Sequence, residues 1–91
     1  MFESRIKKLQ NLLPKYNLES LLVTSPYNIA YLTGIHAFSI EEREARIFVT
    51  KQNIYLFTDA RYTEMVKNNA PFVTLIETTH KNPFSKSINK I

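Results

Sequence analysis

The sequence predicts a mixed α/β domain in which helices flank a mixed β-sheet. Segments with helical and strand-like patterns follow one another in the order helix, strand, helix, strand, strand, helix, strand and partial helix. The strand-like runs 46–50 and 54–57 are joined by only three polar residues, which predicts an antiparallel hairpin. A chain of 91 residues can build a single core, so we expect one domain spanning residues 1–91.

The first two elements are expected to be a helix and a buried strand. Apolar residues recur at helical intervals over residues 2–13, with basic and polar residues between them. Pro14 disfavours helical geometry at Leu13, so the helix should end there. The run 21–24 is apolar on both faces, which predicts a buried strand rather than an exposed edge.

A short helix over residues 26–33 has both of its ends marked in the sequence. Ser25 can cap the N-terminus by accepting a backbone N–H, and Pro26 suits the first helical position. Gly34, the only glycine in the chain, can adopt the left-handed conformation that ends a helix.

The second half of the chain is expected to add a helix, a strand and the start of another helix. Thr58 or Asp59 provides a polar N-cap for a helix over 60–69, and Asp59 suits this role better than that of a catalytic acid. Residues 72–76 read as a strand. A final helix opens at Pro83 and is cut off by the chain end, so we expect the natural unit to be longer.

Composition argues against several classes of protein. The net charge of +4 is moderate, and the sequence has no pattern of aromatic and basic residues of the kind that binds nucleic acid. We therefore expect no nucleic-acid partner. The absence of cysteine excludes disulfides and thiolate metal sites. Charged residues interrupt the N-terminal segment, and no apolar stretch approaches membrane-spanning length. We therefore expect a cytoplasmic protein without a membrane partner.

The chain contains two motifs, Asn28-Ile29-Ala30-Tyr31-Leu32-Thr33-Gly34 and, later, Thr58-Asp59-Ala60-Arg61-Tyr62. In this order and at this separation they resemble the N-terminal domain of the creatinase, prolidase and aminopeptidase P family. The resemblance covers roughly residues 1–76 and implies a ribonuclease-H-like mixed sheet, followed in relatives by a separate pita-bread catalytic domain. In the peptidases that domain binds two divalent metal ions of the Mn, Co or Zn type, which activate water against the bond before proline.

The resemblance implies that this chain lacks the chemistry of its relatives. The metal ligands in the family are two Asp, one His and two Glu, and none of them can be placed here. We expect no catalytic residue, no metal site and no cofactor in this chain, and no peptidase activity from it alone. His36 and His80, the only imidazoles, lie far apart in sequence and have no carboxylate at helical spacing.

What the resemblance does imply is a supporting role in a homo-oligomer. The domain would pack against its own catalytic domain and a neighbouring subunit, and would shape the substrate entrance of an Xaa-Pro dipeptidase or aminopeptidase. His36 and Phe38 follow the first motif, in the loop that faces the neighbouring active site in relatives. Arg61 and Tyr62 match the second motif and are candidates for contact with a substrate carboxylate or a partner chain. A salt bridge or a solvated position remains the alternative for Arg61.

Other matched residues are expected to be structural. Ser25 and Asp59 would cap helices, Gly34 would end one, and Tyr31 would bury its ring. The charged run Glu41 to Glu44 differs from the shorter loops of many relatives. The substrate preference of those relatives therefore cannot be transferred to this chain.

Two other functions stay open at this point. A free-standing interaction module of the same fold, without an attached enzyme, would carry the same motifs. A nucleic-acid binder is the weaker alternative, because ribonuclease H chemistry needs a cluster of carboxylates and the strands offer only Asp59 and Glu77 near their ends.

Overall fold

A computed structural model of the chain describes residues 1–36, 38 and 45–90. The expected loop residues Glu41 to Glu44 and the expected helix residue Ile91 lie outside the described residues. The helices and strands, in chain order, are α1 (Phe2–Leu12), η1 (Pro14–Tyr16), β1 (Ser20–Val23), α2 (Pro26–Thr33), β2 (Ala45–Thr50), β3 (Ile54–Asp59), η2 (Ala60–Tyr62), α3 (Thr63–Asn69), β4 (Thr74–Thr78), α4 (Phe84–Ser87) and η3 (Ile88–Lys90).

The four described strands form one mixed sheet in the order β1-β2-β3-β4. The pairs β1–β2 and β2–β3 are antiparallel, and β4 runs parallel to β3. The hairpin between β2 and β3 closes at Thr50, whose backbone N–H donates to the Asn53 carbonyl at 2.9 Å. The Thr50 hydroxyl oxygen accepts the Asn53 N–H at 3.0 Å. The predicted mixed α/β fold and the predicted antiparallel hairpin are both confirmed.

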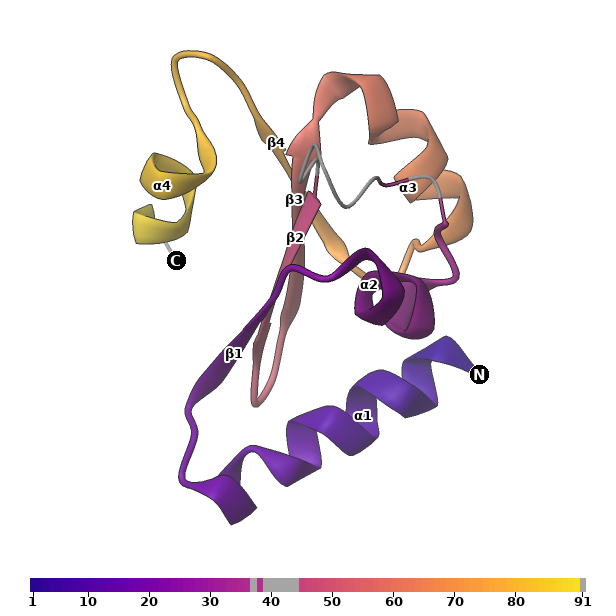
Figure 1. Cartoon of the computed structure of the whole chain (residues 1–91), viewed down its shortest axis with the longest axis vertical. Coiled ribbons are helices and arrows are strands. Elements are labelled where there is room, and N and C mark those ends of the chain that lie inside the picture. The colour runs from indigo at the N-terminus through magenta and orange to yellow at the C-terminus, as the bar shows by residue number, and fades with distance from the viewer. Residues whose placement is uncertain (37, 39–44, 91) are drawn as a thin grey trace.

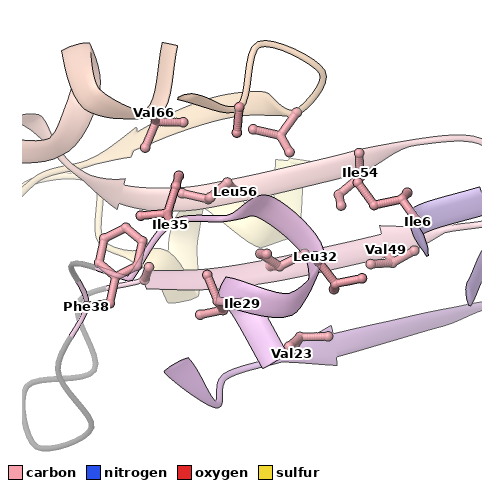
Figure 2. Packing of buried hydrophobic residues seen from close by; sticks show 14 of the residues in the cluster. Ile6, Val23, Ile29, Leu32, Ile35, Phe38, Val49, Ile54, Leu56 and Val66 are labelled. Carbon is pink, nitrogen blue, oxygen red and sulfur yellow. The ribbon is translucent and has the colours of Figure 1, made fainter. Parts of the chain in front are cut away.

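One face of the sheet carries the main hydrophobic core. Helices α1, α2 and α3 all lie on this face (Figure 1). Alternate residues of the central strands point toward them, and Ile47, Val49 and Leu56 are completely buried. Figure 2 shows Ile29 of α2 and Val66 of α3 converging on these strands. The core thus ties all three helices to the central hairpin.

The opposite face of the sheet is covered by α4 near the end of β3 (Figure 1). Phe57 is buried there, and its ring meets that of Phe84 edge-on with centroids 5.0 Å apart. The Arg46 guanidinium lies over the Phe84 ring at 4.6 Å. Aromatic and cation–π contacts of this kind add to the apolar area that the rings bury.

The prediction that the first strand is buried on both faces was wrong. β1 is an edge strand, and the Leu22 side chain is 43% exposed while Val23 is buried. A run of apolar residues cannot by itself separate a central strand from an edge strand whose one face packs against helices. Here α1 and α2 cover only the face that carries Val23.

The first helix ends at Leu12, close to the prediction, but Leu13 keeps helical angles of φ −54° and ψ −49°. The helix therefore ends where predicted, although Leu13 itself keeps the helical conformation that a following proline disfavours. Leu13 is 2% exposed, and its carbonyl accepts the Leu18 N–H at 2.9 Å. Burial and this hydrogen bond outweigh the local preference set by the proline.

Helix α2 has the predicted bounds, but its N-terminus is held differently from the prediction. Ser25 occupies the N-cap with extended backbone angles, yet its hydroxyl makes no capping hydrogen bond to the described helix. The Ser25 carbonyl instead accepts the Ile29 N–H at 2.9 Å. Tyr27 and Asn28 are exposed, so water can satisfy the first N–H groups of the helix.

The C-terminus of α2 depends on Gly34, as predicted. Its φ is +77°, and its N–H donates to the Ala30 carbonyl at 2.7 Å. A Cβ atom at this position would lie 2.7 Å from Cζ of Phe2 in α1. Glycine is therefore required both by the left-handed backbone and by the packing of α1 onto α2.

The later elements differ from the prediction in their bounds. The expected helix over 60–69 begins with the 3₁₀ turn η2 and becomes α-helical only at Thr63. The expected strand over 72–76 starts two residues later, at Thr74, because Val73 turns into the core and donates its N–H to the Ala70 carbonyl. In the described part of the chain, no helix combines the length and apolar character needed to cross a bilayer.

Replacing Gly34 with alanine tests this packing. We expect Gly34→Ala to lower the free energy of unfolding by about 2–4 kcal/mol, from left-handed strain plus displacement of the Phe2 ring. Asn17 is the matched control, because it also has a positive φ of 58° but is exposed. Asn17→Ala should cost only about 1 kcal/mol. Urea unfolding of both variants measures the difference, and equal losses would contradict the role given to Phe2.

Candidate functional site

The junction between β3 and η2 carries Asp59, Arg61 and Tyr62 of the second sequence motif. β3 is a central strand, so its last residue, Asp59, has a fixed position at the end of the sheet. Asp59 is the N-cap of η2, and its Oδ1 accepts the Arg61 N–H at 3.0 Å. The prediction that Asp59 caps the following helical turn is consistent with this geometry. The cap turns the chain sharply and fixes where Arg61 leaves the backbone.

Arg61 and Asp59 form a two-pronged ion pair. Arg61 Nε donates to Oδ1 at 2.9 Å, and Nη2 donates to Oδ2 at 2.7 Å. These side-chain hydrogen bonds hold the pKa of Asp59 below its ordinary value of 3.8. The Arg61 backbone N–H and charge act in the same direction, and partial burial opposes them. The carboxylate therefore stays charged and keeps the guanidinium plane in one orientation.

Aromatic rings complete this arrangement. The Tyr62 ring lies 5.2 Å from the Arg61 guanidinium and meets the Phe38 ring edge-on, with centroids 5.0 Å apart. Phe38 is buried against the core, where Figure 2 shows it beside Ile35. We call Phe38, Asp59, Arg61 and Tyr62 the β3-end cluster. The segment after Gly34 and the second motif thus meet at one place.

The chemistry available to the β3-end cluster is recognition. The Arg61 side chain is 65% exposed, although Asp59 and Tyr62 hold its position. A preorganised guanidinium loses little side-chain freedom when it contacts a carboxylate, and its planar donors match that group. General acid–base catalysis needs a group whose pKa lies near the working pH. The lowered pKa of Asp59 and the permanent charge of arginine do not meet this requirement near neutral pH.

His36 is exposed and stands apart from this cluster. It makes no hydrogen bond, ion pair or ring contact within the part of the chain that the structure describes. It precedes the buried Phe38 by two residues, so it is anchored close to the cluster without belonging to it.

The expectation that Tyr31 buries its ring was wrong. Its side chain is 58% exposed, and its ring lies against the Arg5 guanidinium at 4.3 Å. Arg5 Nη1 also donates to the Tyr31 carbonyl at 2.8 Å. The buried face of α2 is occupied by Ile29 and Leu32, which leaves Tyr31 on the side toward α1. Tyr31 therefore joins two helices and lies outside the β3-end cluster.

Two contacts near these sites had no clear signal in the sequence. Arg5 belongs to an ordinary amphipathic pattern, and its partner lies 26 residues away. The Thr63 hydroxyl donates a short hydrogen bond to Oε1 of Glu77, which links the start of α3 to β4. Both contacts depend on how the helices pack on the sheet, and residue spacing does not reveal this.

The described side chains do not fit a metal centre. Residues 1–36, 38 and 45–90 contain no group of three or more His, Asp or Glu side chains that could hold a metal ion. A two-metal hydrolytic centre needs several such ligands in one place, and the described residues do not assemble them.

Comparison with known proteins identifies what this fold resembles. A model of the Creatinase/Prolidase N-terminal domain family matches residues 5–91. No curated protein matched the sequence.

Several solved structures share the fold. An aminopeptidase P (Xaa-Pro aminopeptidase) from Streptococcus thermophilus is 30% identical with a TM-score of 0.74, over 88% of this chain and 59% of that chain. The N-terminal domain of an X-Pro dipeptidase from Streptococcus pyogenes is 19% identical with a TM-score of 0.82, over 97% and 66%. An Xaa-Pro dipeptidase from Bacillus anthracis is 15% identical with a TM-score of 0.76, and this chain spans 21% of it. This chain thus corresponds to only part of each relative.

The ion pair between Asp59 and Arg61 predicts that the folded protein loses stability at low pH. The Asp59 pKa is lowered in the folded state, so this carboxylate stabilises the fold fully above its ordinary pKa of 3.8. The contribution is lost as the pH falls through the lowered value. Carbon-detected NMR titration of the Asp59 carboxyl should give a value below 3.8, and Arg61→Met should bring it back toward 3.8. Lys67→Met, which removes an exposed cation from α3, should leave it unchanged; an identical pKa in all three proteins would contradict the ion pair.

Proposed function

This chain belongs to the Creatinase/Prolidase N-terminal domain family, and from that premise we propose that it is the non-catalytic N-terminal domain of a metal-dependent Xaa-Pro dipeptidase or aminopeptidase. The family match over residues 5–91 carries the proposal. The names of the relatives supply the reaction class, since an Xaa-Pro aminopeptidase and Xaa-Pro dipeptidases are among the structures with this fold. The domain supports oligomer assembly and shapes the substrate entrance.

The β3-end cluster is the part of the domain that performs this role. Arg61 is exposed yet held by Asp59 and Tyr62, so it can present its cation to a substrate carboxylate or to an acidic group of a partner chain. Phe38 anchors the same surface to the core. Its partners in this proposal are the catalytic domain of the same protein and a neighbouring subunit of a homo-oligomer.

Metal chemistry belongs to a separate catalytic domain in this proposal. Two divalent ions of the Mn, Co or Zn type would be held there, where they lower the pKa of water. The side chains described here do not fit such a centre, so no step of hydrolysis passes through them. A cytoplasmic location is part of the proposal, because a chain without cysteine suits a reducing compartment.

The alternative is a free-standing interaction module of the same fold. The observation that favours it is the position of β1 at the edge of the sheet formed by the described strands, where Leu22 is 43% exposed. An unprotected edge strand beside an exposed apolar residue can add a strand from another chain.

Reading the gene past the codon for Ile91 separates the two functions. The proposed function predicts that the reading frame continues into a domain with two Asp, one His and two Glu as metal ligands. An immediate stop codon would contradict the proposed function and favour the interaction module.

In the complete protein, substitution of Arg61 tests the role of the β3-end cluster. We expect Arg61→Ala to raise KM for an Xaa-Pro dipeptide about tenfold with a smaller change in kcat, because a charged contact made in the ground state is lost. Lys67→Ala removes an exposed cation from the neighbouring helix and should leave both constants unchanged. Equal kinetic constants for the parent protein and Arg61→Ala, with the oligomer also intact, would refute a contact role for Arg61.

A further inference from the structure

One groove of the molecule combines an apolar floor with cationic side chains. Its volume is about 440 Å³, which falls within the range typical of small-molecule sites. It lies between α1, β1 and α2, and we call it the α1–α2 groove. Its lining residues are Arg5, Lys8, Leu9, Leu12, Leu21, Val23, Asn28, Tyr31 and Leu32.

The apolar floor follows from the periodicity of three elements. Leu9 and Leu12 are three residues apart and share one face of α1. Leu21 and Val23 are two residues apart and share one face of β1, and Leu32 adds the wall from α2. Leu12 remains 40% exposed, so this groove is open to a ligand that brings its own apolar surface.

The cations of the groove have no acidic partner among the residues that the structure describes. Arg5 and Lys8 are three residues apart on α1, and neither forms an ion pair within the described part of the chain. Arg5 is positioned by the Tyr31 carbonyl and ring, while Lys8 is exposed. Asn28 adds an amide on the facing helix. An anion in this groove would therefore meet donors on both sides.

We propose that the α1–α2 groove binds an aliphatic carboxylate, with the hydrocarbon chain on the leucine floor and the carboxylate between Lys8, Arg5 and Asn28. A neutral chain would bring no opposite charge to the two cations, and a small anion would leave the leucines uncovered. An amphiphilic anion satisfies both requirements at once. This inference does not depend on the proposed function, because the groove shares no residue with the β3-end cluster.

Decanoate below its critical micelle concentration is the probe. Titration of the 91-residue chain by calorimetry, with methyl NMR shifts of Leu12, Leu21 and Leu32 as a second readout, should show one binding site. Decanol and decyltrimethylammonium, with the same chain and no carboxylate, should bind at least about tenfold more weakly, because only the anion pairs with the cations.

Matched variants separate this groove from general binding of an amphiphile. Lys8→Gln should weaken decanoate about threefold to tenfold, whereas Lys7→Gln, one residue along α1 and outside the groove, should not. Leu12→Ser should weaken it about tenfold, whereas Leu18→Ser should not, although both leucines are 40% exposed. Circular dichroism of each variant confirms that the fold is retained.

The outcomes divide clearly. Selective loss with Lys8→Gln and Leu12→Ser supports the proposal. Equal binding of the three amphiphiles, equal effects of the groove and control variants, or no decanoate binding by the folded chain would overturn it. Self-association that is abolished by Leu12→Ser and unaffected by decanoate would also overturn it, because a second copy of the chain would then occupy the groove.

Discussion

The requirement to cover one face of the central hairpin organises this molecule. Ile47 and Val49 of β2 and Leu56 of β3 are completely buried on the face that α1, α2 and α3 cover. Burial of apolar area is the main favourable term in folding, so the three helices have few alternatives to this arrangement. Gly34 makes it possible, since it ends α2 where the Phe2 ring of α1 must pass.

The positions of both proposed contact surfaces follow from this constraint. β3 carries Asp59 to the end of the sheet, and the cap made by Asp59 sets the direction of Arg61. α1 and α2 pack beside the edge strand β1, and residues of all three elements line the α1–α2 groove. The two surfaces are built differently: the ion pair at Asp59 restrains Arg61, whereas Lys8 has no acidic partner among the described residues.

Local sequence signals predicted the elements well and the tertiary environment less well. The end of α2 at Gly34 and the hairpin before Ile54 were predicted correctly. Both depend on local backbone geometry, which the residue types determine directly. Three predictions were wrong: the burial of Tyr31, the capping hydroxyl of Ser25 and the burial of β1 on both faces. Each of these depends on which neighbour covers a residue, and spacing along the chain does not carry that information. The meeting of Phe38 with Tyr62 has the same origin, because it joins segments that only the folded sheet brings together.

The central claim is that this domain positions contacts for a reaction whose catalytic groups lie elsewhere. Titrating the 91-residue chain with Mn²⁺ in a calorimeter, followed by an assay of the same sample on an Xaa-Pro dipeptide, tests that claim most directly. The account predicts no stoichiometric metal binding and no turnover above the metal alone. Binding of two ions per chain with metal-dependent hydrolysis would contradict it.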